Sequence, residues 1–424
     1  MRVCSIGSNY PKHNVNFGFN VYGDCGASIP EASIKRRLES RDKSKTFVIK
    51  DGVVCPNGIN GAQGFLGGIA DNIATIVRQN IYNLPEDDRF LDNVAIFVPA
   101  QSQNNKVKII SNLRDSSTKA QLRDIDFNHI QGMLTARGVK VSDHFKLVVA
   151  NDMYGAVAGV LNEVLQNEDK YGDLLTKGSK NLIVMPGGGL GVGMFEVDRG
   201  RIRIIAEESG HVVSKAKGKT FEADGASVPA LIGNFAKSLR LSELDKEKLV
   251  KTGNAKIATQ YPVWMEDNSE EYHKLMDTGL FEHKETKDGN AYLVIKKDGS
   301  AITQEEFNKA SKYSVGKFVD DIARLCAIKI NSKAKSALLT GKLIDKINKD
   351  ISHNPAYHGK NIEQMITARI PAYLDPVGVS LAEVKKFKVI YMKMEDNTGG
   401  GSLILNGEQV GENDWMDIPY TNKD

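Results

Sequence analysis

Cysteine is scarce in this sequence, and long apolar runs are missing altogether. The four cysteines among 424 residues are scattered and form no C-x-x-C pair. This pattern predicts reduced thiols in a cytoplasmic protein rather than a disulfide framework. No stretch approaches the ~18 apolar residues that a membrane span requires, and the polar residues 1–16 lack the apolar core of a signal peptide. We therefore expect a soluble cytoplasmic protein with no membrane partner.

An excess of charge of either sign is also lacking. The 56 Lys and Arg residues nearly balance the 53 Asp and Glu residues, and the formal net charge is +3. This balance gives no electrostatic reason to expect nucleic acid as a partner. The hydrophobic share of 41% predicts an ordinary packed core. The length is too great for one compact domain and suits two.

Two common phosphate-binding fingerprints are absent from the most glycine-rich stretch. The apolar run 182–185 leads through Pro186 into the loop 187–193, whose spacing fits neither G-x-G-x-x-G nor G-x-x-x-x-G-K-[ST]. An alternating run with an Asp198-Arg199-Gly200 turn follows, and it predicts a β-hairpin. Strand, glycine turn and strand resemble the phosphate loop of the actin, hexokinase and Hsp70 superfamily. A glycine-rich connection that binds nothing is the alternative interpretation.

Polar motifs on both sides of this loop favour a binding site. Asn151-Asp152 ends the apolar run 147–150, and ligands of open α/β sheets bind at the carboxyl ends of strands. After the hairpin, Glu208 and His211 form the motif E-x-G-H. Asn-Asp, a glycine loop and E-x-G-H in this order resemble the bacterial glucokinases and the related ROK sugar kinases. The resemblance covers the central third of the chain.

This resemblance implies a fold and a division into domains. The implied fold class is α/β, with two ribonuclease-H-like domains (the actin-like ATPase fold) and a cleft between them. We predict a polar tail at 1–16, an N-terminal α/β domain at 17–150 and a C-terminal α/β domain at 151–424. The charged stretch 241–312 is interpreted as an insertion or cap with a solvated face.

The resemblance also implies a sugar site. In this site Asp152 acts as the general base toward a sugar hydroxyl, since a carboxylate within hydrogen-bond reach can take its proton. Two of the implied sugar contacts have an alternative interpretation without a ligand. Asn112 is alternatively a turn residue, and Glu222 is alternatively a carboxylate at a helix start that the helix dipole favours. The implied substrate-binding residues are Asn112, Asn151, Asp152, Glu208, His211 and Glu222.

A nucleotide site is implied as well, with ATP and Mg²⁺ as cofactors. The implied nucleotide-binding residues are Asp24, Gly26, Gly187, Gly188, Gly189, Gly191 and Gly341. Two departures from the family pattern weaken this half of the site: the first phosphate loop, usually D-x-G-G-T, is degenerate after Asp24, and Gly188 replaces the usual Thr of the second loop. Lys342 replaces the second glycine of a Gly-Gly pair, and two interpretations are open: its side chain lies over the nucleotide, or it blocks the nucleotide.

A zinc site is not expected, because the ROK kinases hold zinc with three cysteines just beyond the histidine. No cysteine lies between Val212 and Glu222. The resemblance implies that a homodimer is possible. A hexose is the expected partner.

Hydrophobic periodicity predicts further elements along the chain. A turn is expected at 23–28 and a long helix from Tyr313 onward. The remaining predicted strands are 15–22, 33–38, 46–49, 93–99, 106–110, 336–340 and 387–392, and the predicted helices are 61–82, 124–137 and 229–239.

Three functions fit these motifs to different degrees. The first is an ATP-dependent hexose kinase that phosphorylates glucose at O6. The second is a catalytically weak or inactive relative that binds sugar as a sensor or regulator; no helix-turn-helix is evident in residues 1–60, so DNA binding is disfavoured. The third, a structural ATPase, has no use for the Asn-Asp and Glu-x-x-His motifs.

Overall fold

The structure is a computed structural model of the chain. It describes residues 19–26, 33–40, 46–49, 61–81, 90–98, 100–115, 118–207, 209–212, 218–266, 269–374, 381–393 and 415–417.

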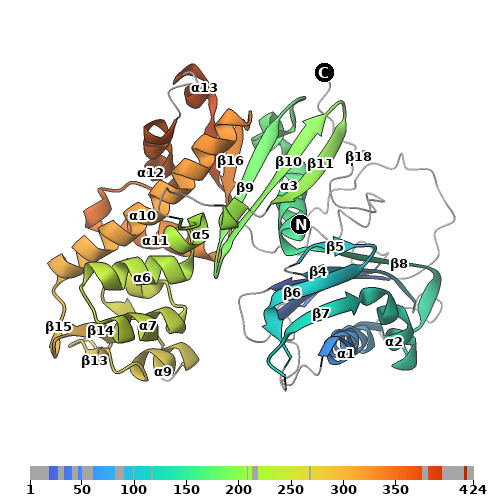
Figure 1. The fold of residues 1–424 in the computed structure, drawn as a ribbon, viewed down its shortest axis with the longest axis horizontal. Helices are drawn as coiled ribbons and strands as arrows, with labels where there is room; N and C mark the ends of the chain where they lie inside the picture. The colour runs from blue at the N-terminus through green and yellow to red at the C-terminus, as the bar shows by residue number, and fades with distance from the viewer. Residues whose placement is uncertain are drawn as a thin grey trace. The chain divides into compact units, whose positions relative to one another are not determined.

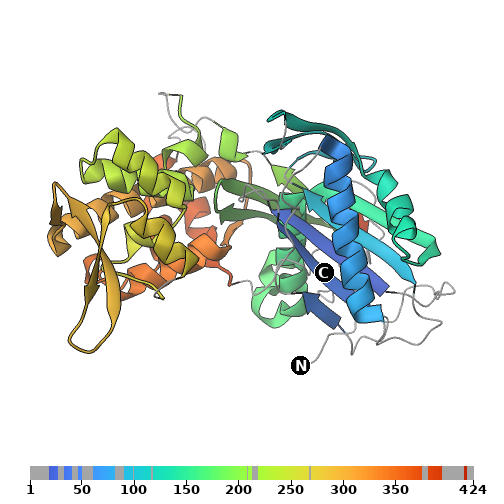
Figure 2. The same ribbon diagram turned by 90° about the horizontal axis from the view of Figure 1, so that it is seen from below.

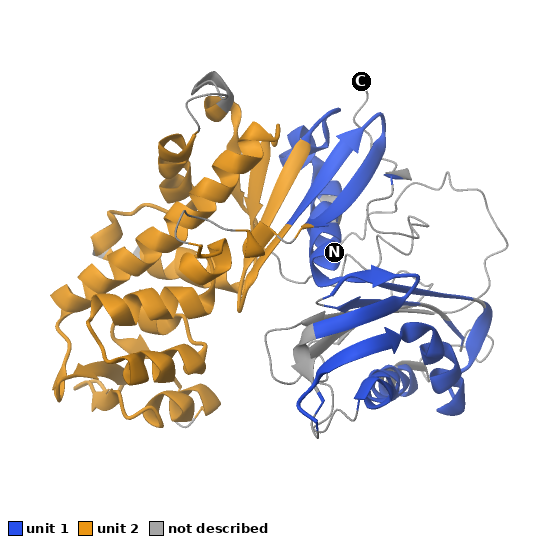
Figure 3. Ribbon diagram, in the orientation of Figure 1, with its two compact units in different colours: residues 1–179, 193–206, 394–424 blue, residues 180–192, 207–393 orange. Residues whose placement is uncertain are grey.

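The chain divides into two compact units (Figure 3). Unit 1 comprises Met1–Ser179, Gly193–Ala206 and Met394–Asp424. Unit 2 comprises Lys180–Val192 and Glu207–Lys393. The predicted domain boundary between residues 150 and 151 stays a prediction.

Unit 1 contains a five-stranded sheet in the order β3-β2-β1-β4-β8. Strands β4 and β8 of this sheet are labelled in Figure 1. The first three strands form an antiparallel meander, and β4 and β8 add to it in parallel. A separate three-stranded sheet has the order β5-β6-β7. The strands are β1 (Phe19–Gly26), β2 (Ser33–Ser40), β3 (Thr46–Ile49), β4 (Leu91–Val98), β5 (Ser102–Gln103), β6 (Lys106–Arg114), β7 (Gln121–Asp126) and β8 (Val141–Asn151).

Helix α1 (Gly61–Ile81) covers one face of the five-stranded sheet (Figure 2). Its apolar residues recur at helical spacing, so one stripe of the helix turns inward. That stripe packs with residues of β4, β6, β7 and α2 (Ile130–Ala136) in one apolar core, which contains Phe65, Ile69, Ile73, Val94, Ile96, Val107, Leu122 and Leu134. The predicted helix at 61–82 is confirmed.

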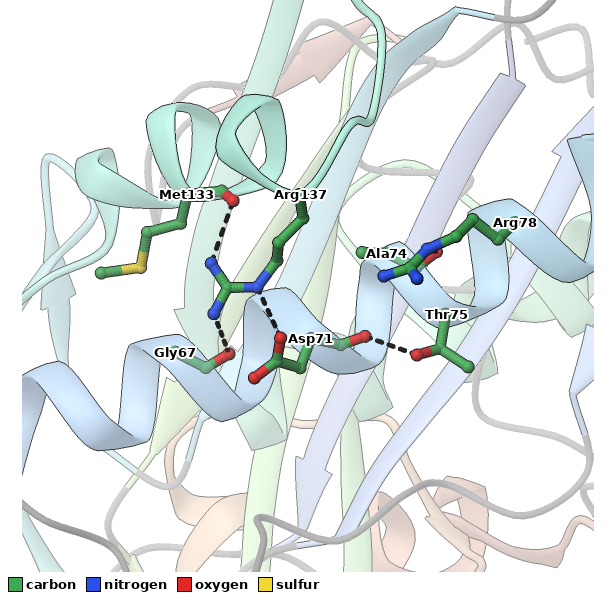
Figure 4. Close-up of polar contacts among 7 residues, drawn as sticks. All are labelled: Gly67, Asp71, Ala74, Thr75, Arg78, Met133 and Arg137. Atoms are coloured by element: carbon green, nitrogen blue, oxygen red, sulfur yellow. Dashed lines mark hydrogen bonds and ion pairs between the residues drawn. The ribbon is translucent and has the colours of Figure 1, made fainter.

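A polar clamp joins α2 to α1 (Figure 4). Arg137 follows the last turn of α2, and its Nε donates to Oδ1 of Asp71 at 2.6 Å. The same guanidinium donates to the carbonyl oxygens of Met133 at 3.0 Å and Gly67 at 3.2 Å. The Arg137 guanidinium holds the pKa of Asp71 below its ordinary value. The clamp fixes where α2 lies along α1.

A six-stranded sheet has the order β17-β16-β9-β10-β11-β18. Strand β16 pairs in parallel with both β17 and β9, and β18 pairs antiparallel with β11. The strands are β9 (Lys180–Pro186), β10 (Leu190–Asp198), β11 (Arg201–Glu207), β16 (Ser336–Leu339), β17 (Lys388–Tyr391) and β18 (Trp415–Asp417). Arg199 and Gly200 both adopt positive φ in the turn between β10 and β11, as tight hairpin turns require. The predicted hairpin is confirmed.

Three further helical elements belong to unit 1 and follow β8. They are α3 (Asp152–Gln166), α4 (Glu168–Tyr171) and the 3₁₀ turn η3 (Gly172–Leu175). Helix α3 approaches β4 so closely that a Cβ on Gly155 would lie 2.6 Å from the Phe97 ring. Glycine is therefore needed at this position.

Unit 2 is built around the long helix α10 (Gln304–Asn331). Its buried side chains contact an apolar core that also includes residues of 241–312, among them Leu249, Leu275 and Leu293. The charged stretch thus contributes to the core of unit 2 as well as to its surface. Its elements are α7 (Glu243–Thr252), α8 (Lys256–Thr259), β12 (Val263–Trp264), α9 (Glu270–Met276), β13 (Phe281–Glu285), β14 (Ala291–Lys297) and β15 (Ser300–Ala301).

The remaining helices of unit 2 flank α10 and β16. They are η4 (Ser209–His211), α5 (Phe221–Asp224), α6 (Val228–Ser238), α11 (Lys342–His353), η5 (Pro355–Tyr357), α12 (Ile362–Arg369), η6 (Ile370–Tyr373) and α13 (Leu381–Lys386). Among the described residues, no helix combines the length and the apolar character needed to cross a bilayer.

Several predicted boundaries were wrong. Strand β1 continues through Gly26, so no turn begins at residue 23. Strand β7 occupies the start of the predicted helix 124–137, because residues 121–126 pair with β6. Helix α10 begins at Gln304 instead of Tyr313, where a capping box of Thr303 and Glu306 starts it.

Candidate functional site

One group of predicted residues lies at the carboxyl edge of the unit 1 sheet. In register, Asp24 on β1 lies beside Phe97 on β4, and Phe97 lies beside Ala150 on β8. Asn151 follows Ala150 at the end of β8. The backbone at Asp24 and the Asn-Asp motif are therefore neighbours across three strands. This is the edge at which open α/β sheets bind ligands.

Asn151 and Asp152 are held by the start of α3. Asn151 is buried and caps the helix, with its Oδ1 accepting from the N–H of Met153 at 2.8 Å. Asp152 is the first residue of the helix, and its Oδ1 accepts from the same N–H at 2.8 Å. The positive end of the helix dipole stabilises a carboxylate here. The Asp152 carboxylate is thus oriented by backbone at the sheet edge.

The glycine loop of unit 2 is short and tightly turned. It consists of residues 187–189, and the N–H of Gly187 donates to the carbonyl oxygen of Gly189 at 2.7 Å. The N–H groups of Gly188 and Gly189 have no acceptor among the described residues. Gly191, which the sequence places in the loop, lies in β10 because pairing begins at Leu190. Two backbone donors of the loop are open to an anion.

Glu222 on α5 lies directly against this loop. Its Oε2 accepts from the N–H of Leu190 at 3.3 Å. A Cβ on Gly189 would lie 3.0 Å from the same oxygen, so a side chain at Gly189 would crowd the carboxylate. Thr220 caps α5 by accepting from the N–H of Ala223 at 3.2 Å, and this fixes the short helix that carries Glu222.

His211 lies near the same carboxylate of Glu222. Its Nδ1 lies 3.8 Å from Oε2 of Glu222, and the His211 side chain is 66% exposed. The preceding Gly210 is buried against the loop, since a Cβ there would lie 2.4 Å from the carbonyl oxygen of Leu190. The glycine loop, His211 and Glu222, which are separate in sequence, therefore meet in unit 2.

Gly341 lies at the same edge of the sheet as the glycine loop. It follows β16, which pairs in parallel with β9, and its φ is +97°. A Cβ on Gly341 would lie 2.9 Å from Cγ of Met185, so backbone conformation and packing both require glycine. Lys342, the departure from the Gly-Gly pattern, begins helix α11.

For two predicted site residues, Glu208 and Asn112, the side-chain position is not described. Glu208 lies outside the described residues. Asn112 lies in strand β6 rather than in a turn, because β6 continues to Arg114, and its side chain is likewise outside the described part. Glu207, which sequence reasoning passed over in favour of its neighbour, is described and has two partners, Lys329 and Ser209.

The donors of unit 2 fit a phosphate group only with a cation nearby. Gly188 and Gly189 offer N–H groups, but the Glu222 carboxylate lies at the same loop and would repel an anion. Kinases hold Mg²⁺ with one or two carboxylates and the phosphates themselves, so a full protein cage is not required. Among the described residues, no group of three or more His, Cys, Asp or Glu residues is arranged to hold a metal ion.

Comparison with known proteins identifies the fold. No protein-family model matches the sequence, and no curated protein sequence matches it. Glucokinase of Balamuthia mandrillaris in complex with glucose is similar in structure, with a TM-score of 0.57 and 15% identity over 92% of this chain and 93% of that chain. A putative sugar kinase of Cytophaga hutchinsonii has a TM-score of 0.53 and 14% identity over 92% and 100% of the two chains.

A third similar structure extends the comparison to hexokinases. The hexokinase of Schistosoma mansoni complexed with glucose has a TM-score of 0.50 and 14% identity over 92% of this chain and 85% of that chain. The predicted α/β fold class of two ribonuclease-H-like domains is confirmed, and so is the resemblance to glucokinases and related sugar kinases. At these identities the similarity establishes the fold alone.

Proposed function

We propose that this protein is an ATP-dependent hexose kinase that converts glucose to glucose 6-phosphate. The observation that carries the proposal is the meeting of the glycine loop 187–189 with Glu222 and His211 in unit 2. A loop with two open N–H donors suits a phosphate. A carboxylate and an imidazole suit sugar hydroxyls, which both donate and accept hydrogen bonds. Their proximity is what transfer from a nucleotide to a sugar requires.

Asp152 is the proposed general base. It accepts the proton of the O6 hydroxyl while O6 attacks the γ-phosphorus of ATP, the bond from that phosphorus to the bridging oxygen breaks, and ADP leaves. The backbone N–H of Met153 and the α3 dipole hold the carboxylate in the orientation that this transfer needs. Mg²⁺, when bound with ATP, neutralises the charge that develops on the phosphates.

The other residues of the proposal bind and orient. Asn151, Glu208, His211 and Glu222 hold the remaining sugar hydroxyls, and Asn112 is a further proposed sugar contact. The nucleotide phosphates are proposed to bind the loop at Gly187, Gly188 and Gly189, together with Gly191 in the adjoining strand β10, and to approach Asp24 and Gly26 at the end of strand β1. Gly341 is proposed to adjoin the adenosine, since a glycine leaves room there. Action in the cytoplasm and a possible homodimer remain part of the proposal.

One observation favours the alternative, a sugar-binding protein of the same fold with little or no kinase activity. Glu222 already accepts from the N–H of Leu190, the first residue of β10 after the loop, so this donor is not available to a phosphate. The hydroxyl donor expected at position 188 is missing as well, since the residue is Gly188. A lost contact of this kind can lower the rate about 10²-fold.

The decisive experiment is ADP release from Mg-ATP with a panel of hexoses. A no-sugar reaction and the Asp152→Asn variant are the controls. Glucose-dependent turnover that the variant lacks supports the kinase. A glucose-induced rise in melting temperature without any turnover supports the non-catalytic alternative, and neither effect refutes both.

A further inference from the structure

An ion pair lies immediately beside the segment that carries the proposed sugar ligands. Lys329 on α10 pairs with Glu207, the last residue of β11, through Nζ and Oε2. The side chains of Lys329 and Glu207 are only 14% and 17% exposed. Exposed ion pairs contribute little, whereas a mostly buried pair leaves an uncompensated charge if one partner is lost. This pair therefore constrains the chain where β11 ends.

The same carboxylate oxygen continues into the turn. Oε2 of Glu207 also accepts from Oγ of Ser209 at 2.5 Å, and Ser209 is the first residue of the turn η4 that ends at His211. Lys329, Glu207 and Ser209 thus form one connected chain of polar contacts. It links a long helix to the turn that carries the imidazole.

Packing against Leu190 also fixes the turn. Gly210 lies against Leu190, and the N–H of Val212 donates to the carbonyl oxygen of Ser209 at 3.2 Å. Ser209 is held by Glu207 and Gly210 by Leu190, and the next residue, His211, lies 3.8 Å from Glu222.

Helix α10 is a rigid support for this arrangement. Cys326 and Ile330, which flank Lys329 on the helix, are buried in the core of unit 2. A side chain anchored on a packed helix positions its partners more accurately than one on a loop.

We propose that Lys329 is a positioning residue for sugar binding. Through Glu207 and Ser209 it holds the turn that carries His211, and so it sets the affinity for the hexose. This inference rests on the proposed function, in which His211 contacts the sugar. It predicts that Lys329 affects sugar affinity without touching the sugar.

The test uses Lys329→Met, Lys329→Arg and the matched control Lys312→Met. Lys312 is on the same helix, is exposed, and forms no ion pair within the described residues. We expect Lys329→Met to raise the KM for glucose about ten- to a hundredfold, because a displacement of ~1 Å can have that effect. The KM for ATP should stay within about twofold of wild type. Lys329→Arg should restore most of the affinity, and Lys312→Met should behave as wild type.

A second measurement separates this inference from the proposed function. The imidazole NMR signal of His211, assigned by its loss in His211→Gln, reports the surroundings of the turn without any sugar. Glu222→Gln should move this signal, Lys329→Met and the milder Ser209→Ala should move it too, and Lys312→Met should leave it in place. If these shifts occur but wild type binds no hexose, the positioning role stands and the sugar-kinase proposal fails.

The inference is overturned if folded Lys329→Met keeps both the His211 signal and the KM for glucose of wild type. It is also overturned if KM for ATP and KM for glucose rise together while the His211 signal stays in place. That result would show a general loss of stability in place of a defined role. Should Lys329→Met fail to fold, Ser209→Ala decides the same question with the same signal.

Discussion

Replacing Gly210 with alanine tests the central packing contact of the candidate site. The added Cβ would lie 2.4 Å from the carbonyl oxygen of Leu190 and 3.1 Å from its Cβ. Optimal separations of non-bonded heavy atoms are about 3.5 Å or more. The turn at residues 209–211 must therefore move by about 1 Å away from the glycine loop, and His211 moves with it.

The magnitude follows from two opposing effects. Forcing extra atoms into a packed site costs about 1–3 kcal/mol. Gly210 does not have a positive φ, so alanine also restricts the unfolded chain and returns about 0.4–1 kcal/mol. We expect a net loss of up to about 2.6 kcal/mol in the free energy of unfolding, or a fall of up to about 10 °C in the melting temperature of unit 2. Sugar affinity should fall about ten- to a hundredfold.

The matched control is Gly316→Ala, the same substitution in the same unit. Gly316 lies inside α10, and a Cβ there meets no atom within 4 Å. Alanine is preferred over glycine in a helix by about 0.5–1 kcal/mol, so this variant should be more stable than wild type. Thermal unfolding by circular dichroism and glucose binding by calorimetry give both quantities for both variants.

The reasoning is refuted if the two glycine variants behave alike. Should Gly210→Ala melt at or above the wild-type temperature and bind sugar normally, the turn does not pack on Leu190 as the structure shows. If stability falls while sugar affinity is unchanged, the packing of Gly210 on Leu190 is supported and the role of His211 in sugar binding is refuted.

Three other residues give independent predictions. Asp152→Asn should keep glucose binding within a few-fold while turnover falls about 10²–10⁴-fold; equal loss of both, by calorimetry and ADP release, would exclude a general base. Burial raises the pKa of the Cys326 thiol to about 12, so a variant with Cys326 as sole cysteine should react with a thiol reagent at pH 8 only in denaturant; rapid labelling of the native protein would contradict this burial. The Asp71 carboxyl has a lowered pKa beside Arg137, so its contribution is present above its unfolded pKa and is lost as pH falls through the lowered value. Asp71→Asn should lower the free energy of unfolding, measured with urea, by about 0.2–1 kcal/mol at pH 7 and should leave it unchanged in strong acid. An equal decrease at both pH values would exclude a contribution from the ion pair.

Where the sequence predicted an element correctly, the signal was local. The apolar run of β9, the glycines after it and the Asp198-Arg199-Gly200 turn each impose a conformation on a few adjacent residues. The helix α1 was predictable because its apolar stripe repeats over its whole length. Such signals do not depend on what the segment contacts.

Strand β7 was missed because of one residue. Asp124 adopts a φ of +52° within the strand, which departs from the extended backbone of its neighbours. This irregularity leaves Leu122 and Ile125 both buried, three positions apart, which is the spacing of a helix. Alternation, the usual mark of a strand, is lost at this point.

The start of α10 was missed for a different reason. Thr303 and Glu306 form a capping box that is visible in the sequence. The charged residues around it outweighed this signal, although Phe307 and Ala310 are buried. Attention to the cap would have placed the helix correctly.

The sequence alone determined which chemical groups are present and in what order, including the glycine loop, the Asn151-Asp152 pair and His211. It also indicated the fold class, since strand and helix periodicities are local properties. Only the tertiary structure decided which of these groups meet. Glu222 contacts the loop at Leu190, and Lys329 pairs with Glu207 across 122 positions of sequence. Contacts of this kind depend on how distant apolar faces pack together, and no local pattern encodes that packing.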